Sequence, residues 1–324
     1  MKRTALIAIL CTLALSYTTA QTDMNIGKQH IALSNRTMTP EALWAMGRIS
    51  ACSASPDGKR IIYQVGYYSV KQNKSHQVLY MVNADGTGQT LLTTSAKNET
   101  DATWLAADKV AFISAGEIWM MNADGTERRQ LTNSNGQVEG YKFAPNRKQV
   151  IIVKSIPFHE SIAEKPADLP KATGRLVSDL MYRHWDHYVE TIQHPFVHSV
   201  GDDYTVASVG KDILEAEPYE CPMEPFGGME QMDWSTDSRF IAYTCRKKTG
   251  LQYSISTDSD IYLYDTTEKT TRNLCKPQNY EEPAIDPTKT MRQQAVNAPG
   301  NLVNNVGYDQ NPKFSPDGKR IAWL

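Results

Sequence analysis

The stretch Asn83-Ala84-Asp85-Gly86-Thr87 recurs 39 residues later as Asn122-Ala123-Asp124-Gly125-Thr126. Both copies lie between short apolar runs, which for the first copy are residues 78–82 and 90–93. Asp-Gly between two such runs is a strong hairpin signal, because glycine accepts the positive φ of a type I′ turn. The repeat therefore predicts two copies of one strand–turn–strand unit.

A second repeated element stands directly before predicted strands. Ser55-Pro56-Asp57-Gly58-Lys59-Arg60 returns as Ser315-Pro316-Asp317-Gly318-Lys319-Arg320 near the end of the chain. Proline presets φ at the second position of a type I turn, and glycine suits the fourth. Degenerate copies at 144–147 and 235–238 also precede apolar runs, so the same turn is expected to open several strands.

The elements follow one another as turn, strand, loop, strand, Asp-Gly hairpin and strand. With a linking strand this makes a four-stranded meander of about 40 residues, which is the period of a β-propeller blade. Runs such as 78–82 and 150–153 do not alternate with polar residues, so both sheet faces should be buried. We therefore expect an all-β protein, an incomplete β-propeller of about four and a half blades over residues 50–324, rather than a two-sheet sandwich.

Composition narrows the function classes. Of the 324 residues, 40% are hydrophobic, and 34 basic residues stand against 36 acidic ones, for a net charge of −2. Because the charges nearly balance, the chain has no net positive charge to attract a polyanion, so nucleic-acid binding is not expected. No later apolar run reaches the roughly 18 residues that a membrane-spanning helix needs.

The N-terminus has the features of an export signal. Lys2 and Arg3 precede an apolar stretch of 11 residues, and small residues, Thr18 and Ala20, precede Gln21. Residues 1–20 are therefore expected to be a signal peptide and the protein to be periplasmic or secreted. Residues 21–49 form an N-terminal segment with a short helix, in which Thr39 is the cap and Pro40 the first residue.

Residues 157–230 interrupt the repeat after blade three and are expected to form an insertion. Four of the seven histidines lie here (His184, His187, His194 and His198). Their spacing does not match a known zinc site, so we expect them to pack and hydrogen-bond, with no metal and no cofactor. After Cys11 is excluded with the signal peptide, four cysteines remain, too few for a disulfide scaffold.

Several motifs together resemble the prolyl oligopeptidase family of serine peptidases, and most of all its dipeptidyl-peptidase 5 and acylaminoacyl-peptidase-like branch. They are Met38-Thr39-Pro40-Glu41, Arg48-Ile49-Ser50, the Ser55 turn, Tyr182-Arg183-His184-Trp185-Asp186, Gly227-Gly228-Met229-Glu230 and Ser256-Thr257-Asp258-Ser259-Asp260-Ile261-Tyr262. The resemblance covers nearly all of residues 37–324. It implies a propeller that caps a C-terminal α/β-hydrolase domain carrying Ser, Asp and His.

That catalytic domain is expected to lie beyond this chain. Gly-x-Ser-x-Gly, the nucleophile elbow of such hydrolases, does not occur in the sequence. In its nearest approximation, Val206-Ala207-Ser208-Val209-Gly210, valine replaces the glycine that the sharp turn requires. The chain also stops inside an inner strand, so we expect a fragment that holds no catalytic residue and is inactive alone.

The resemblance also directs attention to substrate recognition. An aminopeptidase-type cleft must hold the substrate ammonium, which carboxylates and an aromatic face can do. Arg183, His184, Trp185, Asp186 and Glu230 are the candidate substrate-binding residues, and Glu215 and Glu217 are further carboxylates nearby. The alternative for Arg183 and Asp186 is an internal ion pair that holds the insertion against the blades.

Two functions follow from these features. The first is a propeller that gates the cleft of an exported dipeptidyl-peptidase-like enzyme and selects short peptides, with its own C-terminal hydrolase domain as partner. The second is a non-enzymatic periplasmic propeller that resembles TolB and binds other proteins. The insertion favours the first.

Overall fold

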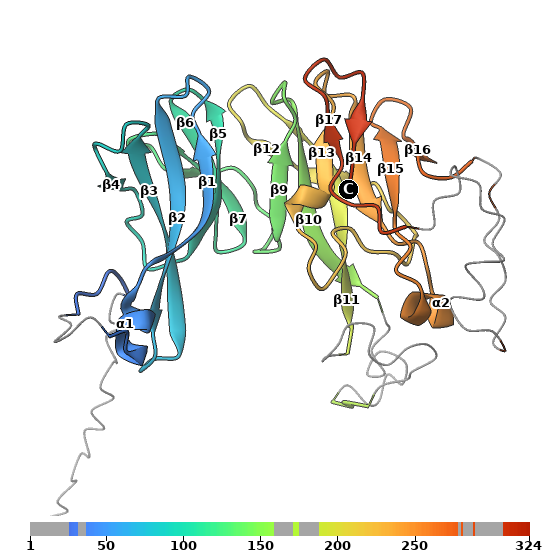
Figure 1. The fold of residues 1–324 in the computed structure, drawn as a ribbon. Coiled ribbons are helices and arrows are strands. Elements are labelled where there is room, and N and C mark those ends of the chain that lie inside the picture. Colours follow the sequence, from blue (N-terminus) through green and yellow to red (C-terminus); the bar gives the residue numbers. More distant parts are fainter. Residues whose placement is uncertain are drawn as a thin grey trace, which may run out of the picture.

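A computed structural model describes residues 26–31, 37–158, 171–174, 188–277, 280, 288 and 307–324. Nearly all of the regular structure in these ranges is strand (Figure 1). The signal-peptide prediction, residues 1–20, falls outside them. Within these ranges, no helix has both the length and the apolar character that crossing a membrane requires.

The strands form four antiparallel meanders of four strands each and a final pair. Blade one contains β1 (Arg48–Ala54), β2 (Arg60–Ser69), β3 (Lys74–Asn83) and β4 (Thr90–Leu91). Blade two contains β5 (Glu99–Ala106), β6 (Lys109–Ser114), β7 (Glu117–Asn122) and β8 (Arg129–Gln130). Blade three contains β9 (Gly140–Phe143), β10 (Gln149–Pro157), β11 (Thr191–Val200) and β12 (Val206–Asp212).

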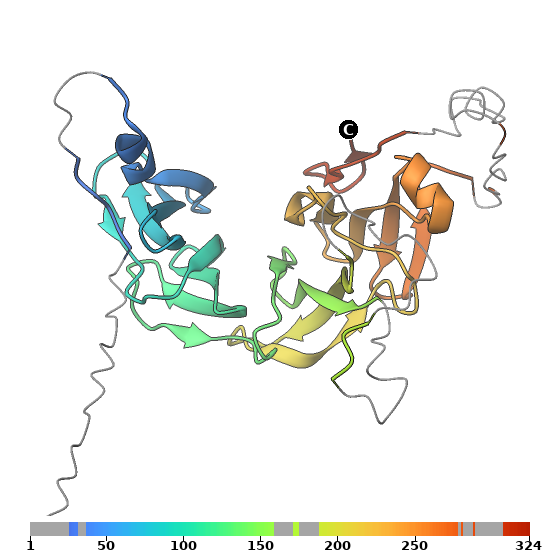
Figure 2. The same cartoon turned by 90° about the horizontal axis from the view of Figure 1, so that it is seen from below.

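Blade four contains β13 (Met232–Trp234), β14 (Phe240–Cys245), β15 (Asp260–Asp265) and β16 (Thr270–Asn273). The final pair is β17 (Lys313–Phe314) and β18 (Ile321–Ala322). Figure 2 shows the sheets standing side by side along an open arc. The predicted propeller of about four and a half blades is therefore confirmed.

Packing between neighbouring blades explains why the strands are apolar on both faces. Ile62 and Leu79 of blade one share a buried cluster with Val110 and Phe112 of blade two. Equivalent clusters join blade two to three, three to four, and four to the final pair. Each central sheet thus buries two faces, which removes the polar alternation expected of a one-sided sheet.

The repeated Asp-Gly turns form hairpins as predicted, but their turn type differs. Within residues 83–87 only Gly86 has a positive φ, +84°, and its N–H donates to the Asn83 carbonyl at 2.8 Å. Asp85 accepts hydrogen bonds from the Thr87 N–H and hydroxyl at 2.9 and 2.6 Å. A type I turn that ends in a left-handed glycine therefore replaces the expected type I′ turn.

The extent of the insertion in blade three is corrected. Within the expected range of 157–230, β11 and β12 are regular blade strands, and β11 pairs with β10 from Gln149 opposite Ser199 to Pro157 opposite Thr191. Pro195 and two buried histidines give β11 a sequence that does not resemble a core strand. Residues 158–190 therefore join β10 to β11, with 159–170 and 175–187 outside the described ranges, and residues 213–231 join blades three and four.

Helices are few and short. The expected N-terminal helix is α1 (Pro40–Ala45), where the Thr39 hydroxyl accepts from the Ala42 N–H at 3.2 Å. A second helix, α2 (Gly250–Ile255), connects β14 to β15, and a 3-10 turn, η2 (Met229–Gln231), precedes β13.

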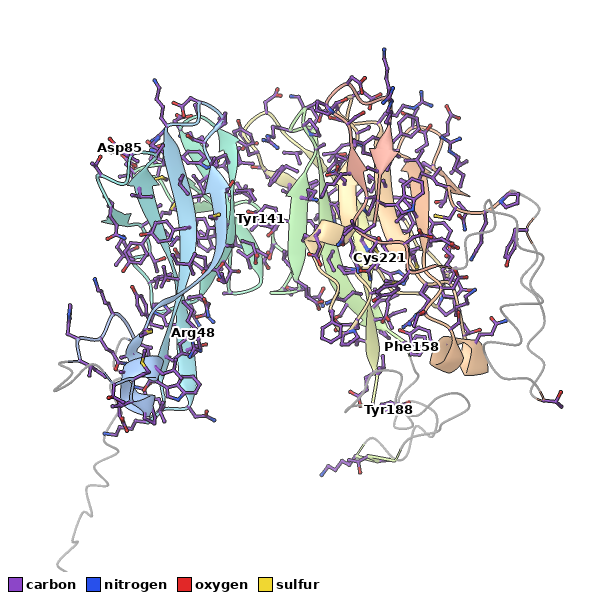
Figure 3. All side chains as sticks on the ribbon, in the orientation of Figure 1. Arg48, Asp85, Tyr141, Phe158, Tyr188 and Cys221 are labelled. Atoms are coloured by element: carbon purple, nitrogen blue, oxygen red, sulfur yellow. The ribbon has the colours of Figure 1, made fainter. Side chains whose placement is uncertain are left out.

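These irregular elements distinguish the two ends of the blades. The helices α1 and α2 lie at the lower end in Figure 1. In Figure 3, Phe158 and Tyr188 mark the same end, where β10 and β11 project below the sheet, and Asp85 lies at the opposite end. The lower end is therefore the place to examine for a functional site.

Candidate functional site

Four of the five residues expected to contact substrate fall outside the described ranges. These are Arg183, His184, Trp185 and Asp186, so their recognition role stays a prediction. Glu230 is the one member of the set that the structure places.

Glu230 is an exposed carboxylate on η2, between blades three and four. No described residue forms a hydrogen bond or an ion pair with its side chain. Its neighbour Met229 anchors the turn, because a Cβ added at Gly140 of β9 would lie 2.7 Å from the Met229 sulfur. Glu230 is thus presented to solvent from a turn packed against blade three.

The segment around Glu230 is held by hydrogen bonds between its own residues. The buried Gln231 side chain accepts from the Met223 N–H at 2.7 Å, and the Gly227 N–H donates to the Met223 carbonyl at 2.8 Å. A Cβ at Gly227 would overlap both the Gln231 side chain and the Met223 backbone. This close approach explains the glycine in the Gly-Gly-Met-Glu motif.

The other candidate carboxylates of this segment have cationic partners. Glu215 forms an ion pair with Lys211, and Glu217 forms one with Lys247. Both carboxylates are thus already paired within the protein, and a part in substrate binding stays a prediction for them.

A buried polar contact that the sequence did not reveal joins this segment to α2. The Tyr253 hydroxyl donates to Glu220 Oε1 at 2.5 Å, and the Arg246 guanidinium carbon lies 3.9 Å from the centre of the Tyr253 ring. Burial, followed by the charge and hydrogen bond of Glu220, raises the pKa of Tyr253. This contact fixes α2 against residues 213–231 beside blade four.

His194 and His198 are buried in blade three, as the packing interpretation predicted. His194 Nδ1 lies 2.9 Å from Asp212 Oδ2, and His198 Nδ1 lies 2.8 Å from the Ala207 carbonyl oxygen. Burial lowers the pKa of His198 below its ordinary value. Both imidazoles therefore stabilise the pairing of β11 with β12, and His184 and His187 lie outside the described residues.

The approximate Gly-x-Ser-x-Gly match contributes no nucleophile elbow. Val206 to Gly210 lie on β12, whose Ser208 is exposed at the outer edge of blade three. An elbow requires a strained turn from a strand into a helix, and the chain continues here as extended strand. The sequence-based rejection is confirmed.

A pocket of about 490 Å³ lies between α1 and blade one. Its lining is mainly apolar and aromatic, and includes Ala42, Met46, Ile49, Tyr63, Tyr67 and Tyr80. It contains neither Glu230 nor any carboxylate, so it does not suit a substrate ammonium.

Comparison with known proteins identifies relatives. No protein-family model matches the chain. Dipeptidyl-peptidase 5 of Porphyromonas gingivalis is 44% identical over 292 residues, which are 89% of this chain and 38% of the relative. Dipeptidyl-peptidase 5 of Porphyromonas endodontalis is 37% identical over 331 residues, which are 100% of this chain and 43% of the relative. The chain thus spans about two fifths of the length of these relatives.

Solved structures that align with this chain are more distant in sequence than these relatives. The acylaminoacyl peptidase of Pyrococcus horikoshii aligns with a TM-score of 0.48 at 10% identity, covering 72% of this chain and 33% of that one. Dipeptidyl peptidase 4 of Porphyromonas gingivalis aligns with a TM-score of 0.38 at 12% identity, covering 70% and 32%. The sequence similarity to the two Porphyromonas relatives confirms the resemblance that the motifs indicate, to the dipeptidyl-peptidase 5-like branch of the prolyl oligopeptidase family of serine peptidases.

Proposed function

We propose that this chain is the substrate-recognition propeller of an exported dipeptidyl-peptidase-like serine exopeptidase that cleaves short peptides. Its 44% identity to a dipeptidyl-peptidase 5 supports this function most directly. In the proposal, the catalytic domain lies outside these residues, and the propeller admits and orients peptides at the end that carries α1, α2, Phe158 and Tyr188. The sequence similarity favours this function over a TolB-like scaffold.

Glu230 is proposed to bind the free ammonium of the peptide. An exposed carboxylate without a protein partner can accept a charge-assisted hydrogen bond without first breaking an internal ion pair. Glu215 and Glu217 do not have this property. Arg183, His184, Trp185 and Asp186 are proposed to complete the recognition surface, with Trp185 offering an aromatic face to the cation.

A chimaeric enzyme tests the proposal. This chain would replace the 292 matching residues of the Porphyromonas gingivalis relative, and hydrolysis of a free-amine dipeptidyl substrate would be compared with hydrolysis of an N-blocked ester. A charge-assisted contact contributes about 1.5–3 kcal/mol. Glu230→Gln should therefore lower kcat/KM for the free-amine substrate roughly ten- to hundred-fold and leave the ester nearly unchanged.

Two comparisons make the test specific. Glu215→Gln removes a carboxylate of the same segment that is already paired with Lys211, and should affect neither substrate. Asp186→Ala should act like Glu230→Gln if Asp186 binds the ammonium. Equal losses on both substrates, together with a lowered Tm, would instead indicate that Asp186 forms the internal ion pair with Arg183.

A further inference from the structure

A buried group of charged and thiol side chains lies where blade four meets the segment that leads to β17. Each member is at most 9% exposed: Lys248, Asp258, Asp260, Cys275, Lys276 and Asp309. None of them belongs to the proposed recognition surface. Because buried charges are costly unless they are matched, the group requires an explanation of its own.

Three separate parts of the chain bring the thiol and two of the carboxylates together. Asp260 is the first residue of β15, and Cys275 follows β16, where its sulfur accepts from the Ile261 N–H at 3.3 Å. Asp309 is tied to blade four through Ser259, whose hydroxyl donates to the Asp309 carbonyl at 3.0 Å. The backbone of this segment thus fixes Asp309 beside the start of β15.

The two lysines form ion pairs with Asp258 and Asp260. Lys276 Nζ lies 2.6 Å from Asp258 Oδ2 and 2.9 Å from Asp260 Oδ2, and Lys248 Nζ lies 2.9 Å from Asp258 Oδ2. Burial lowers the pKa of Lys276, but its hydrogen bonds to Asp258 and Asp260 outweigh burial and raise it. The two ammonium groups thus bind Asp258 and one oxygen of Asp260, Oδ2.

One carboxylate oxygen of Asp260 has no donor. Asp260 Oδ1 is buried and accepts no hydrogen bond from any residue that the structure describes. Burial, its largest cause, raises the pKa of the Asp260 carboxyl. Such a buried oxygen can be satisfied either by protonation of the carboxyl group or by a bound cation. The nearby thiol and second carboxylate favour a cation.

The geometry suits one metal ion. A carboxylate oxygen of Asp260, the sulfur of Cys275 and a carboxylate oxygen of Asp309 all lie within 4.8 Å of one another. Zinc binds thiolate at about 2.3 Å and carboxylate at about 2.0–2.2 Å, so that its ligands lie roughly 3–4 Å apart. Small side-chain movements would bring all three donors to that distance.

We propose that Asp260, Cys275 and Asp309 bind a divalent cation of the zinc class, with water as a fourth ligand. On binding, the Cys275 S–H bond breaks, a metal–sulfur bond forms and one proton leaves to solvent. The ion adds two positive charges and the thiolate one negative charge, so binding adds one net positive charge beside the carboxylates of Asp260 and Asp309. Because a cysteine binds a metal as the thiolate, binding of the cation and loss of the thiol proton are coupled.

Such an ion would have a structural role. Cys275 and Asp309 are 34 residues apart in the sequence, and one ion would join the end of blade four to the segment entering β17. Glu230 is not one of the three ligands, so this proposal does not depend on the peptidase function.

Cobalt provides a direct test on the full 324-residue chain. After treatment with a chelator, the protein should take up one equivalent of Co²⁺ and show a thiolate-to-cobalt charge-transfer absorption in the near ultraviolet, and Zn²⁺ should abolish that absorption. Cys275→Ser should remove the band, and Asp309→Asn should weaken Co²⁺ binding at least tenfold. Cys52→Ser, which changes an exposed cysteine of β1, should leave both unchanged.

A second measurement needs no variant. Zn²⁺ should slow alkylation of Cys275 in the wild-type chain at least tenfold, as located by peptide mapping, without protecting Cys52. A wild-type chain that shows neither the band nor this protection would overturn the proposal and leave a protonated Asp260 as the explanation. Persistence of the band in a folded Cys275→Ser variant, checked by circular dichroism, would overturn it as well.

Discussion

Glu117 on β7 offers a sharp test of how this propeller is stabilised. Its carboxylate accepts from the Thr132 hydroxyl at 2.5 Å and from the N–H groups of Ser134 and Gly136, both at 2.8 Å. Burial alone would raise its pKa, but the hydrogen bonds from Thr132, Gly136 and Ser134 outweigh burial and lower it. The side chain therefore holds the connection between blades two and three.

The expected loss follows from these contacts. Glu117→Ala removes three charge-assisted hydrogen bonds, each contributing about 1.5–3 kcal/mol. Ser134 is half-buried and Gly136 exposed, so water replaces part of what is lost. The free energy of unfolding should fall by about 2–4 kcal/mol, which corresponds to a Tm lower by roughly 5–10 °C. Denaturant unfolding followed by circular dichroism measures the free energy, and calorimetry the Tm.

The way in which the unfolding free energy changes with pH gives a second test, because its direction follows from the lowered pKa. A carboxyl whose folded pKa is depressed stabilises the protein above its unfolded pKa, and that contribution is lost as the pH falls through the folded pKa. The difference in unfolding free energy between wild type and Glu117→Gln should therefore be largest above about pH 5 and shrink at lower pH. Glu127→Gln, an exposed residue of the same blade, should change stability little. A difference for Glu117→Gln that is no larger than this control, or that grows as the pH falls, would refute the reasoning.

Two further predictions concern chemistry that the chain should not perform. The purified chain of residues 21–324 should hydrolyse neither peptides nor esters above background, because it has no nucleophile elbow, and stoichiometric labelling of one serine by a fluorophosphonate probe would contradict this. Cys245 on β14 and the Cys275 that follows β16 are separated by β15, a distance of about 10 Å that exceeds the roughly 7 Å limit for a disulfide. A tryptic map of the native protein should show no linkage between them, and finding one would mean that the strand order is wrong.

The sequence predicted those parts of the fold that depend on local chemistry. The Asp-Gly and Ser-Pro-Asp-Gly turns are closed by residues two to five positions apart, so their recurrence located the strands. The missed strand β11 shows the limit of this reasoning. Its buried positions include His194 and Pro195, and Asp212 bonds Nδ1 of that histidine, a partner that a local pattern does not reveal. Tertiary pairing made a core strand from a sequence that resembles a loop.

The candidate site was predicted less completely, because its electrostatics depend on distant partners. Glu217, Glu215 and Glu230 resemble one another in the sequence as carboxylates of a single segment. Lys247, which pairs with Glu217, lies 30 residues away in sequence, and the buried Asp260 and Asp309 come from different blades. Only the folded chain distinguishes an acid already matched by a cation from one left for a ligand.

The same distinction explains why the lower end of the propeller is the better functional candidate. At the opposite end, the turn carboxylates accept hydrogen bonds within their own loops: Asp85 from Thr87, and Asp57 from Ser55 and the Lys59 N–H. These hydrogen bonds lower the pKa of both aspartates. Because each carboxylate is committed to closing its turn, binding a ligand there would have to break that turn. Glu230 closes no turn with its side chain, so the ammonium that we propose it binds would not have to break any hydrogen bond within a turn.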